Sequence, residues 1–192
     1  RSTERFARAA RQTAPALSWA PVAEPRAKRA MVIGLDSAEP SLVEAWRDEL
    51  PTLSGLMARG VHGRLTSVIP PITVPAWSCM MASRTPGDLG VYGFRNRSDH
   101  TYDGRFIADG SAIKAPRLWD LVGRAGGSSI VVGVPGTYPP RPLRGALVTC
   151  FLTPSVDSTY TYPPGLKNEV ADVVGEYMFD VKDFRTDNKG WL

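Results

Sequence analysis

Two oxygen-bearing side chains in this 192-residue chain have types and positions that could support chemistry. Asp36 ends the apolar run 32–35, and Thr73 follows thirty-seven residues later within Pro-Pro-Ile-Thr-Val-Pro. A carboxylate can bind a divalent cation such as magnesium or zinc, and a hydroxyl beside such a cation can act as a nucleophile. The pair is therefore a candidate for one metal-dependent site.

Asp36 also has structural interpretations. Directly after a predicted strand, its carboxylate could cap the next helix, hold a loop amide or bind a cation. Ser37 and Glu39 could share the capping role. The residue types alone leave these alternatives open.

Thr73 has a structural interpretation as well, because a threonine at the start of a helix is most often its N-cap. The same position also favours catalysis. Free N–H groups and the helix dipole at that end attract an anion such as a phosphate. Threonine is a poor nucleophile at neutral pH unless a base or a metal lowers the effective pKa of its hydroxyl.

Strands alternating with helices are expected to position these residues. The hydrophobic pattern predicts strands at 30–35, 61–69, 128–134, 146–151 and 176–181, and helices at 41–50, 52–59, 75–83, 115–125 and 163–175. Thr52 is a possible N-cap and Gly60 a helix end, and loops cover 84–110 and 135–145. This order predicts an α/β fold with a mainly parallel sheet, in which Asp36 lies beyond the carboxyl end of a strand.

The positive charge is concentrated at the start of the chain. Residues 1–30 hold seven basic and two acidic side chains, whereas residues 31–192 hold sixteen and seventeen. The basic arm has neither interleaved aromatic residues nor a recognition motif, so nucleic acid is an unfavoured partner and a solvated tail is expected. We therefore predict two regions, an arm at 1–30 and a catalytic-domain portion at 31–192.

The cysteines and the hydropathy bear on location. Cys79 and Cys150 are far apart and outside any paired spacing, so buried free thiols are expected. No stretch has the length of a membrane span. These features predict a cytoplasmic protein, with export left open because the first residue is Arg1.

An ordered series of motifs covers residues 31 to about 165 and resembles the type I phosphodiesterase/nucleotide pyrophosphatase family of the alkaline phosphatase superfamily. The motifs are Val-Ile-Gly-Leu-Asp-Ser-Ala-Glu-Pro (32–40), Gly-Arg-Leu (63–65), Ile-Pro-Pro-Ile-Thr-Val-Pro-Ala-Trp (69–77), Pro-Gly-Asp-Leu-Gly-Val-Tyr (86–92), Ala-Pro-Arg-Leu-Trp-Asp-Leu (115–121), Val-Pro-Gly-Thr-Tyr-Pro-Pro (134–140), Phe-Leu-Thr-Pro-Ser (151–155) and Tyr-Pro-Pro (162–164). The series is far more specific than any single motif.

The resemblance implies an alkaline-phosphatase-like α/β fold, with helices flanking a mainly parallel central sheet that this chain holds only in part. It implies two divalent metal ions, usually zinc, with manganese or magnesium as alternatives. Asp36 matches the first metal ligand, and Thr73 matches the nucleophile, which also contacts a metal. Thr73 would form a phospho-threonine intermediate during hydrolysis of a small-molecule or lipid-linked phosphate ester.

The chain departs from the family pattern at two points. Nucleotide-cleaving members have an asparagine where this chain has Phe94, although Asn96 is near. Nucleotide, lipid-linked, sugar and other diester substrates therefore all stay open. The family takes further ligands from later Asp and His residues, whereas the only histidines here are His62 and His100.

We accordingly expect the remaining metal ligands to come from the rest of the catalytic domain, in the same or a second chain, and the isolated chain to be inactive. Trp77 stands where a sulfatase would need an arginine, so sulfatase chemistry is disfavoured. The alternative of a different class is a non-catalytic binding or assembly fragment that uses the basic arm.

Overall fold

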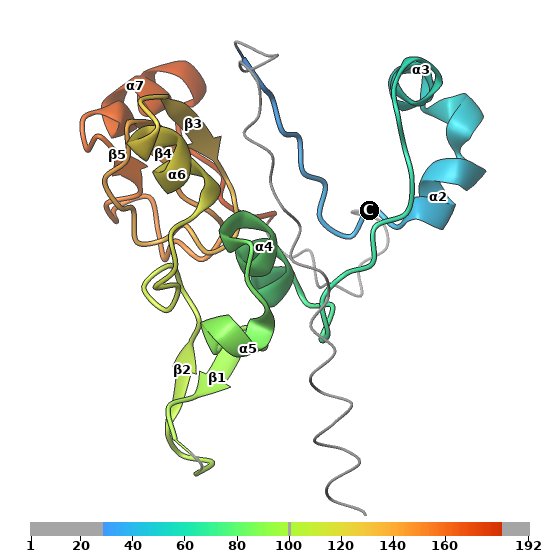
Figure 1. Cartoon of the computed structure of the whole chain (residues 1–192). Helices are drawn as coiled ribbons and strands as arrows, with labels where there is room; N and C mark the ends of the chain where they lie inside the picture. Colours follow the sequence, from blue (N-terminus) through green and yellow to red (C-terminus); the bar gives the residue numbers. More distant parts are fainter. Residues whose placement is uncertain (1–28, 100, 182–192) are drawn as a thin grey trace, which may run out of the picture. The chain divides into compact units, whose positions relative to one another are not determined.

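The computed structural model describes residues 29–99 and 101–181 of the chain (Figure 1). The chain divides into two units, Arg1–Glu39 and Pro40–Leu192, and each is described by itself. The described part of the first unit, residues 29–39, contains no helix or strand and makes a turn at Asp36 and Ser37. Nearly all of the predicted basic arm lies outside the described residues.

The predicted strand at 30–35 is wrong for the structure. Its apolar side chains Met31, Val32, Ile33 and Leu35 are between 61% and 85% exposed. A buried parallel strand needs neighbours at its edges and cover on both faces. No described segment pairs with this run, so its apolar side chains are not buried as a strand's would be.

Two other predicted strands are also absent from the described residues. The segment 61–69 is unpaired, and its apolar side chains Val61, Leu65 and Ile69 are exposed. The segment 176–181 has no ladder partner either. Its aromatic residues pack instead on Tyr160, with ring centroids 5.8 Å away for Tyr177 and 5.0 Å away for Phe179.

The second unit begins with helix α2 (Pro40–Ala45), a 3₁₀ turn (Arg47–Glu49) and helix α3 (Pro51–Arg59). The predicted helix at 41–50 is therefore broken after Ala45. Helix α3 confirms the predicted helix at 52–59 and its end at Gly60. Thr52 is not the N-cap, because Leu50 holds that place and Pro51 fills the first helical position, where its missing N–H costs nothing.

Helix α4 (Thr73–Ala82) confirms the helix predicted at 75–83 and begins two residues earlier. The loop predicted at 84–110 contains regular structure. It holds the short helix α5 (Pro86–Leu89) and a hairpin of antiparallel strands β1 (Arg95–Arg97) and β2 (Arg105–Ile107). Strands of three residues are too short to show an alternating pattern, so the sequence did not predict them.

A mixed sheet follows, with strand order β3-β4-β5 (Figure 1). Strands β3 (Ser129–Val132) and β4 (Gly145–Val148) are parallel, as predicted, and β5 (Thr161–Tyr162) runs antiparallel to β4. Helix α6 (Leu118–Arg124) contacts β3, and helix α7 (Leu166–Val174) contacts β5. The described residues thus form helices and small mixed sheets, and the mainly parallel central sheet stays a prediction.

Helix α4 takes part in two packed clusters. Its Val74 is fully buried with Val91, Ala108 and Ile113. Its Met81 packs against a second cluster built on Trp119, Val131 and Leu147 of α6, β3 and β4. Burial of side chains of this size is worth roughly 1.5–3 kcal/mol each, so both ends of α4 are held by packing.

None of the described helices has both the length and the apolar character needed to cross a bilayer.

Candidate functional site

Thr73 is the first residue of α4, and its side chain is half-buried. The N-cap is Ile72, which has extended backbone angles, φ −112° and ψ 145°. An N-cap residue must have such non-helical angles, so Ile72 excludes Thr73 from that role. The interpretation of Thr73 as a capping residue is therefore wrong.

The start of α4 can hold an oxyanion. An α-helix leaves the N–H groups of its first turn without intrahelical acceptors. In α4 the first helical bond is made by Ala76 to the Ile72 oxygen at 2.9 Å, Pro75 has no N–H, and Val74 is fully buried. The helix dipole adds positive potential at the same end.

Buried residues hold this helix in place. Val74, Pro75, Ser78 and Cys79 are all buried. The Ser78 hydroxyl is the buried side-chain oxygen without a hydrogen-bond partner among the described residues. A methyl group placed on Gly136 would lie 3.4 Å from this hydroxyl, which shows that the loop after β3 packs directly on α4.

Arg117 fixes that loop. Its side chain is only 4% exposed, and its two terminal nitrogens donate to the carbonyl oxygens of Gly136 at 3.0 Å and Gly110 at 2.8 Å. Burial lowers the pKa of the Arg117 guanidinium, and the nearby positive charge of Arg141 lowers it further. This role of Arg117 was not predicted, because a buried arginine between two loops follows no periodic pattern.

Asp36 occupies the turn that follows the exposed run 30–35, and it is itself exposed. Ser37, the next residue, has a left-handed φ of 58°, which is uncommon for a residue other than glycine. The Glu39 N–H donates to the Ser37 carbonyl at 2.9 Å and closes the turn. Asp36 belongs to the first unit and Thr73 to the second.

The donor atoms of Asp36 and Thr73 suit a divalent cation, since both are oxygens. Among residues 29–99 and 101–181, however, no three His, Cys, Asp or Glu side chains gather as a metal site would require. His62 is exposed and lies in no strand, contrary to its predicted place, and His100 lies outside the described residues. The described residues therefore fit part of a ligand set.

Asn96 is committed to the backbone of its own loop. Its amide oxygen accepts from the Tyr92 N–H at 2.7 Å, and its amide nitrogen donates to the Gly93 carbonyl at 2.9 Å. Phe94 instead packs near Phe151, with ring centroids 6.1 Å apart. Asn96 is thus a structural residue of the hairpin rather than a substitute for the family asparagine.

The two cysteines are free and buried, as predicted. Burial raises the pKa of the Cys79 thiol, and the negative charge of Asp88 raises it further. A thiol whose pKa is raised stays protonated at neutral pH and is a poor nucleophile. Cys79, six residues after Thr73 in the same helix, is therefore no rival for that role.

Comparison with known proteins agrees with the motif series. No curated protein and no solved structure matches the chain. The sequence model of the type I phosphodiesterase / nucleotide pyrophosphatase family matches residues 30–191, a range that includes Asp36 and Thr73. The chain belongs to the type I phosphodiesterase/nucleotide pyrophosphatase family.

Proposed function

We propose that the chain contributes the nucleophile and the first metal ligand of a phosphate-ester hydrolase. Family membership supports the hydrolase class. The observation that carries the nucleophile is the place of Thr73, which opens α4 without being its N-cap. Its hydroxyl thus lies at the positive end of the helix dipole, which favours a phosphoryl oxygen.

In the proposed reaction, the Thr73 oxygen attacks phosphorus as the bond from phosphorus to the leaving oxygen breaks. The Thr73 hydroxyl gives up its proton to water, and the leaving group departs with that electron pair and takes a proton from water. Thr73 then carries the phosphoryl group as a phospho-threonine, and water cleaves this ester to restore the hydroxyl. The positive end of the α4 dipole would stabilise charge on a non-bridging oxygen during both displacements.

Two divalent cations, zinc or alternatively manganese or magnesium, would complete this chemistry. The Asp36 carboxylate and the Thr73 hydroxyl are the ligands that we assign. Bound cations would lower the effective pKa of the Thr73 hydroxyl and neutralise phosphate charge. We propose that the other ligands come from the rest of the catalytic domain, in the same or a second chain.

For the substrate, we propose a small-molecule or lipid-linked phosphate ester. Phe94 stands where nucleotide-cleaving members have an asparagine, and Asn96 is held by Tyr92 and Gly93. Neither residue supports a nucleotide over another ester. The buried free thiols Cys79 and Cys150 support a reducing, cytoplasmic location in the same proposal.

The test compares the intact polypeptide with its Thr73→Ala and Thr73→Ser variants. Each is incubated with zinc and bis(p-nitrophenyl) phosphate, stopped in acid and examined by intact mass. We expect a covalently bound p-nitrophenyl phosphoryl group on the original protein, a weaker signal for Thr73→Ser and none for Thr73→Ala. Equal turnover by Thr73→Ala would remove the nucleophile from the proposal. Absence of both turnover and stoichiometric metal would favour the non-catalytic fragment.

A further inference from the structure

The β1–β2 hairpin concentrates positive charge. On β1, the exposed Arg95 and Arg97 flank the buried Asn96, and on β2 the exposed Arg105 is the direct cross-strand partner of Arg97. Like charges placed opposite each other on paired strands are destabilising. A bound anion would therefore reduce the repulsion between the arginines of the hairpin.

No carboxylate neutralises these arginines among residues 29–99 and 101–181, where the ion pair that forms joins Arg47 to Glu44. Asp99 is near, but its carboxylate accepts from the Thr101 N–H at 2.8 Å and from the Thr101 hydroxyl at 2.7 Å. The Arg97 guanidinium instead lies 4.1 Å from the centre of the Tyr102 ring. A stacked guanidinium keeps its edge N–H groups available to a ligand.

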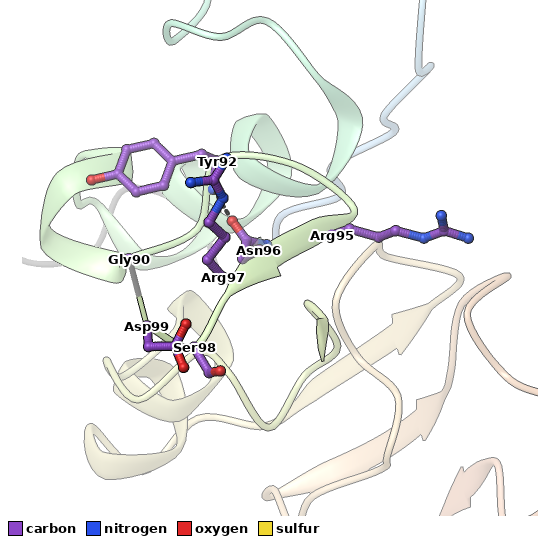
Figure 2. A pocket seen from close by; sticks show the side chains of 7 residues that line it. All are labelled: Gly90, Tyr92, Arg95, Asn96, Arg97, Ser98 and Asp99. Carbon is purple, nitrogen blue, oxygen red and sulfur yellow. Dashed lines mark hydrogen bonds between the residues drawn. The ribbon is translucent and has the colours of Figure 1, made fainter. Parts of the chain in front are cut away.

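The arginines line two adjoining hollows. The larger one, of about 500 Å³, is bordered by Arg95 and Arg97 together with Tyr92, Ser98 and Asp99 (Figure 2). Arg95 also borders a second hollow of about 200 Å³ with Arg105. In Figure 2 the Arg97 side chain extends toward Tyr92, whereas Arg95 extends away from it. The positive charge thus follows the hairpin and does not converge on one point.

The base of this hairpin is attached to the two neighbours of Thr73 in the sequence. Val91, before β1, and Ala108, after β2, share the buried cluster of Val74. A methyl group placed on Gly93 would lie 4.0 Å from the Ile72 side chain. The hairpin is therefore built onto the start of α4, where the proposed nucleophile lies.

We propose that the cross-strand pair Arg97 and Arg105, with Arg95 adding positive charge along the same strand, binds a phosphate-type oxyanion of the substrate that is not the group attacked by Thr73. The inference rests on the proposed function, because it places this anion on the same substrate. Arginine suits the task, since its planar fork of N–H groups matches the oxygens of a phosphate. A soluble phosphorylated compound and a phospholipid headgroup share this chemistry.

The test measures binding rather than turnover. The full chain, labelled with nitrogen-15, is titrated with inorganic phosphate at constant ionic strength while the arginine Nε–Hε resonances are followed. A triple variant, Arg95→Gln with Arg97→Gln and Arg105→Gln, should bind phosphate at least about tenfold more weakly, because charged hydrogen bonds are lost. A matched control removes the same charge elsewhere, at the exposed Arg59, Arg124 and Arg144, and should bind as the original chain does.

A fold check by circular dichroism accompanies each variant. If the triple variant does not fold, the single Arg105→Gln change replaces it, since it removes the repulsion with Arg97 and should still weaken binding. Phosphate shifts of equal size at Arg59 and Arg124, or unchanged binding by the folded hairpin variant, would overturn the proposal.

Two further experiments identify the source of the anion and separate this site from the nucleophile. Co-sedimentation with phosphatidylcholine vesicles, with and without phosphatidic acid, separates the two sources: binding that needs the lipid phosphate supports a headgroup, and binding in solution alone supports a soluble compound. Thr73→Ala should leave the phosphate-induced shifts of the hairpin arginine resonances unchanged while it abolishes the phospho-threonine. Failure of the hairpin site is thereby distinguished from failure of the nucleophile.

Discussion

The Arg117 guanidinium donates a 3.0 Å hydrogen bond to the carbonyl oxygen of Gly136, nineteen residues further along the chain. Gly136 in turn lies against Ser78 in the middle of α4. The arginine thus positions the loop that supports the helix of Thr73, although it is not itself a candidate for chemistry. Loss of this contact should affect stability before it affects any reaction.

Replacement of Arg117 by lysine should lower the free energy of unfolding by about 2 to 4 kcal/mol. Lysine keeps the charge but cannot reach both the Gly110 and the Gly136 carbonyl with a planar fork, and hydrogen bonds from charged donors are worth roughly 1.5–3 kcal/mol each. Urea unfolding followed by tryptophan fluorescence measures the change. Arg124→Lys, at an exposed position of α6, should have almost no effect. Equal losses of stability in the two variants would show that the hydrogen bonds from Arg117 to Gly110 and Gly136 do not stabilise the fold.

Replacement of Gly145 by alanine should disrupt the start of β4. Gly145 has a φ of 135°, and a methyl group there would collide with the backbone of its strand partner Ser129. We expect the free energy of unfolding to fall by about 1 to 3 kcal/mol. Gly63→Ala is the matched control, because nothing lies within 4 Å of the added methyl group and Gly63 does not have a left-handed φ. That change should be neutral or slightly stabilising, and a mild effect at both positions would contradict the expected collision.

The Asp88 carboxylate should titrate below its ordinary range. The Thr85 N–H and hydroxyl donate to it at 3.0 and 2.8 Å, and these hydrogen bonds lower the pKa of Asp88, with a smaller effect from Arg84. A lowered pKa in the folded state stabilises the fold above the unfolded pKa, about 3.9 for aspartate. This stabilisation is lost as the pH falls through the folded pKa.

Carbon-13 NMR titration of the aspartate carboxyl groups measures this shift. Thr85→Ala should return the Asp88 pKa toward its ordinary value. The Asp99 pKa, which hydrogen bonds from Thr101 lower, should not respond to that change. An Asp88 pKa unaffected by Thr85→Ala would show that the capping box at the start of α5 does not cause the shift.

The sequence predicted elements well where local pattern and local partners agree. The run at 128–134 became β3, because β4 pairs with it and α6 covers it. The run at 30–35 has the same β-branched character, but an apolar pattern indicates only that burial would be favourable. A partner strand must supply that burial, and none of the described residues does so.

In the candidate site, too, some features follow from the local sequence and others do not. The place of Thr73 at a helix start follows from Pro75 and the apolar residues after it. The residue that caps α4 did not follow, because a backbone conformation at Ile72 decides it rather than a side-chain type. Arg117 depends on contacts with two separate loops, and the β1–β2 hairpin has strands of only three residues, so neither leaves a periodic pattern in the sequence.

Strand β3 lies at one edge of its sheet within the described residues, with Ile130 82% and Val132 57% exposed. Unpaired N–H and C=O groups beside exposed apolar side chains are a template on which other chains can add. Protein concentration is therefore a variable in its own right for this molecule. Titrations and unfolding curves should be repeated at several dilutions, so that self-association is not mistaken for ligand binding or for added stability.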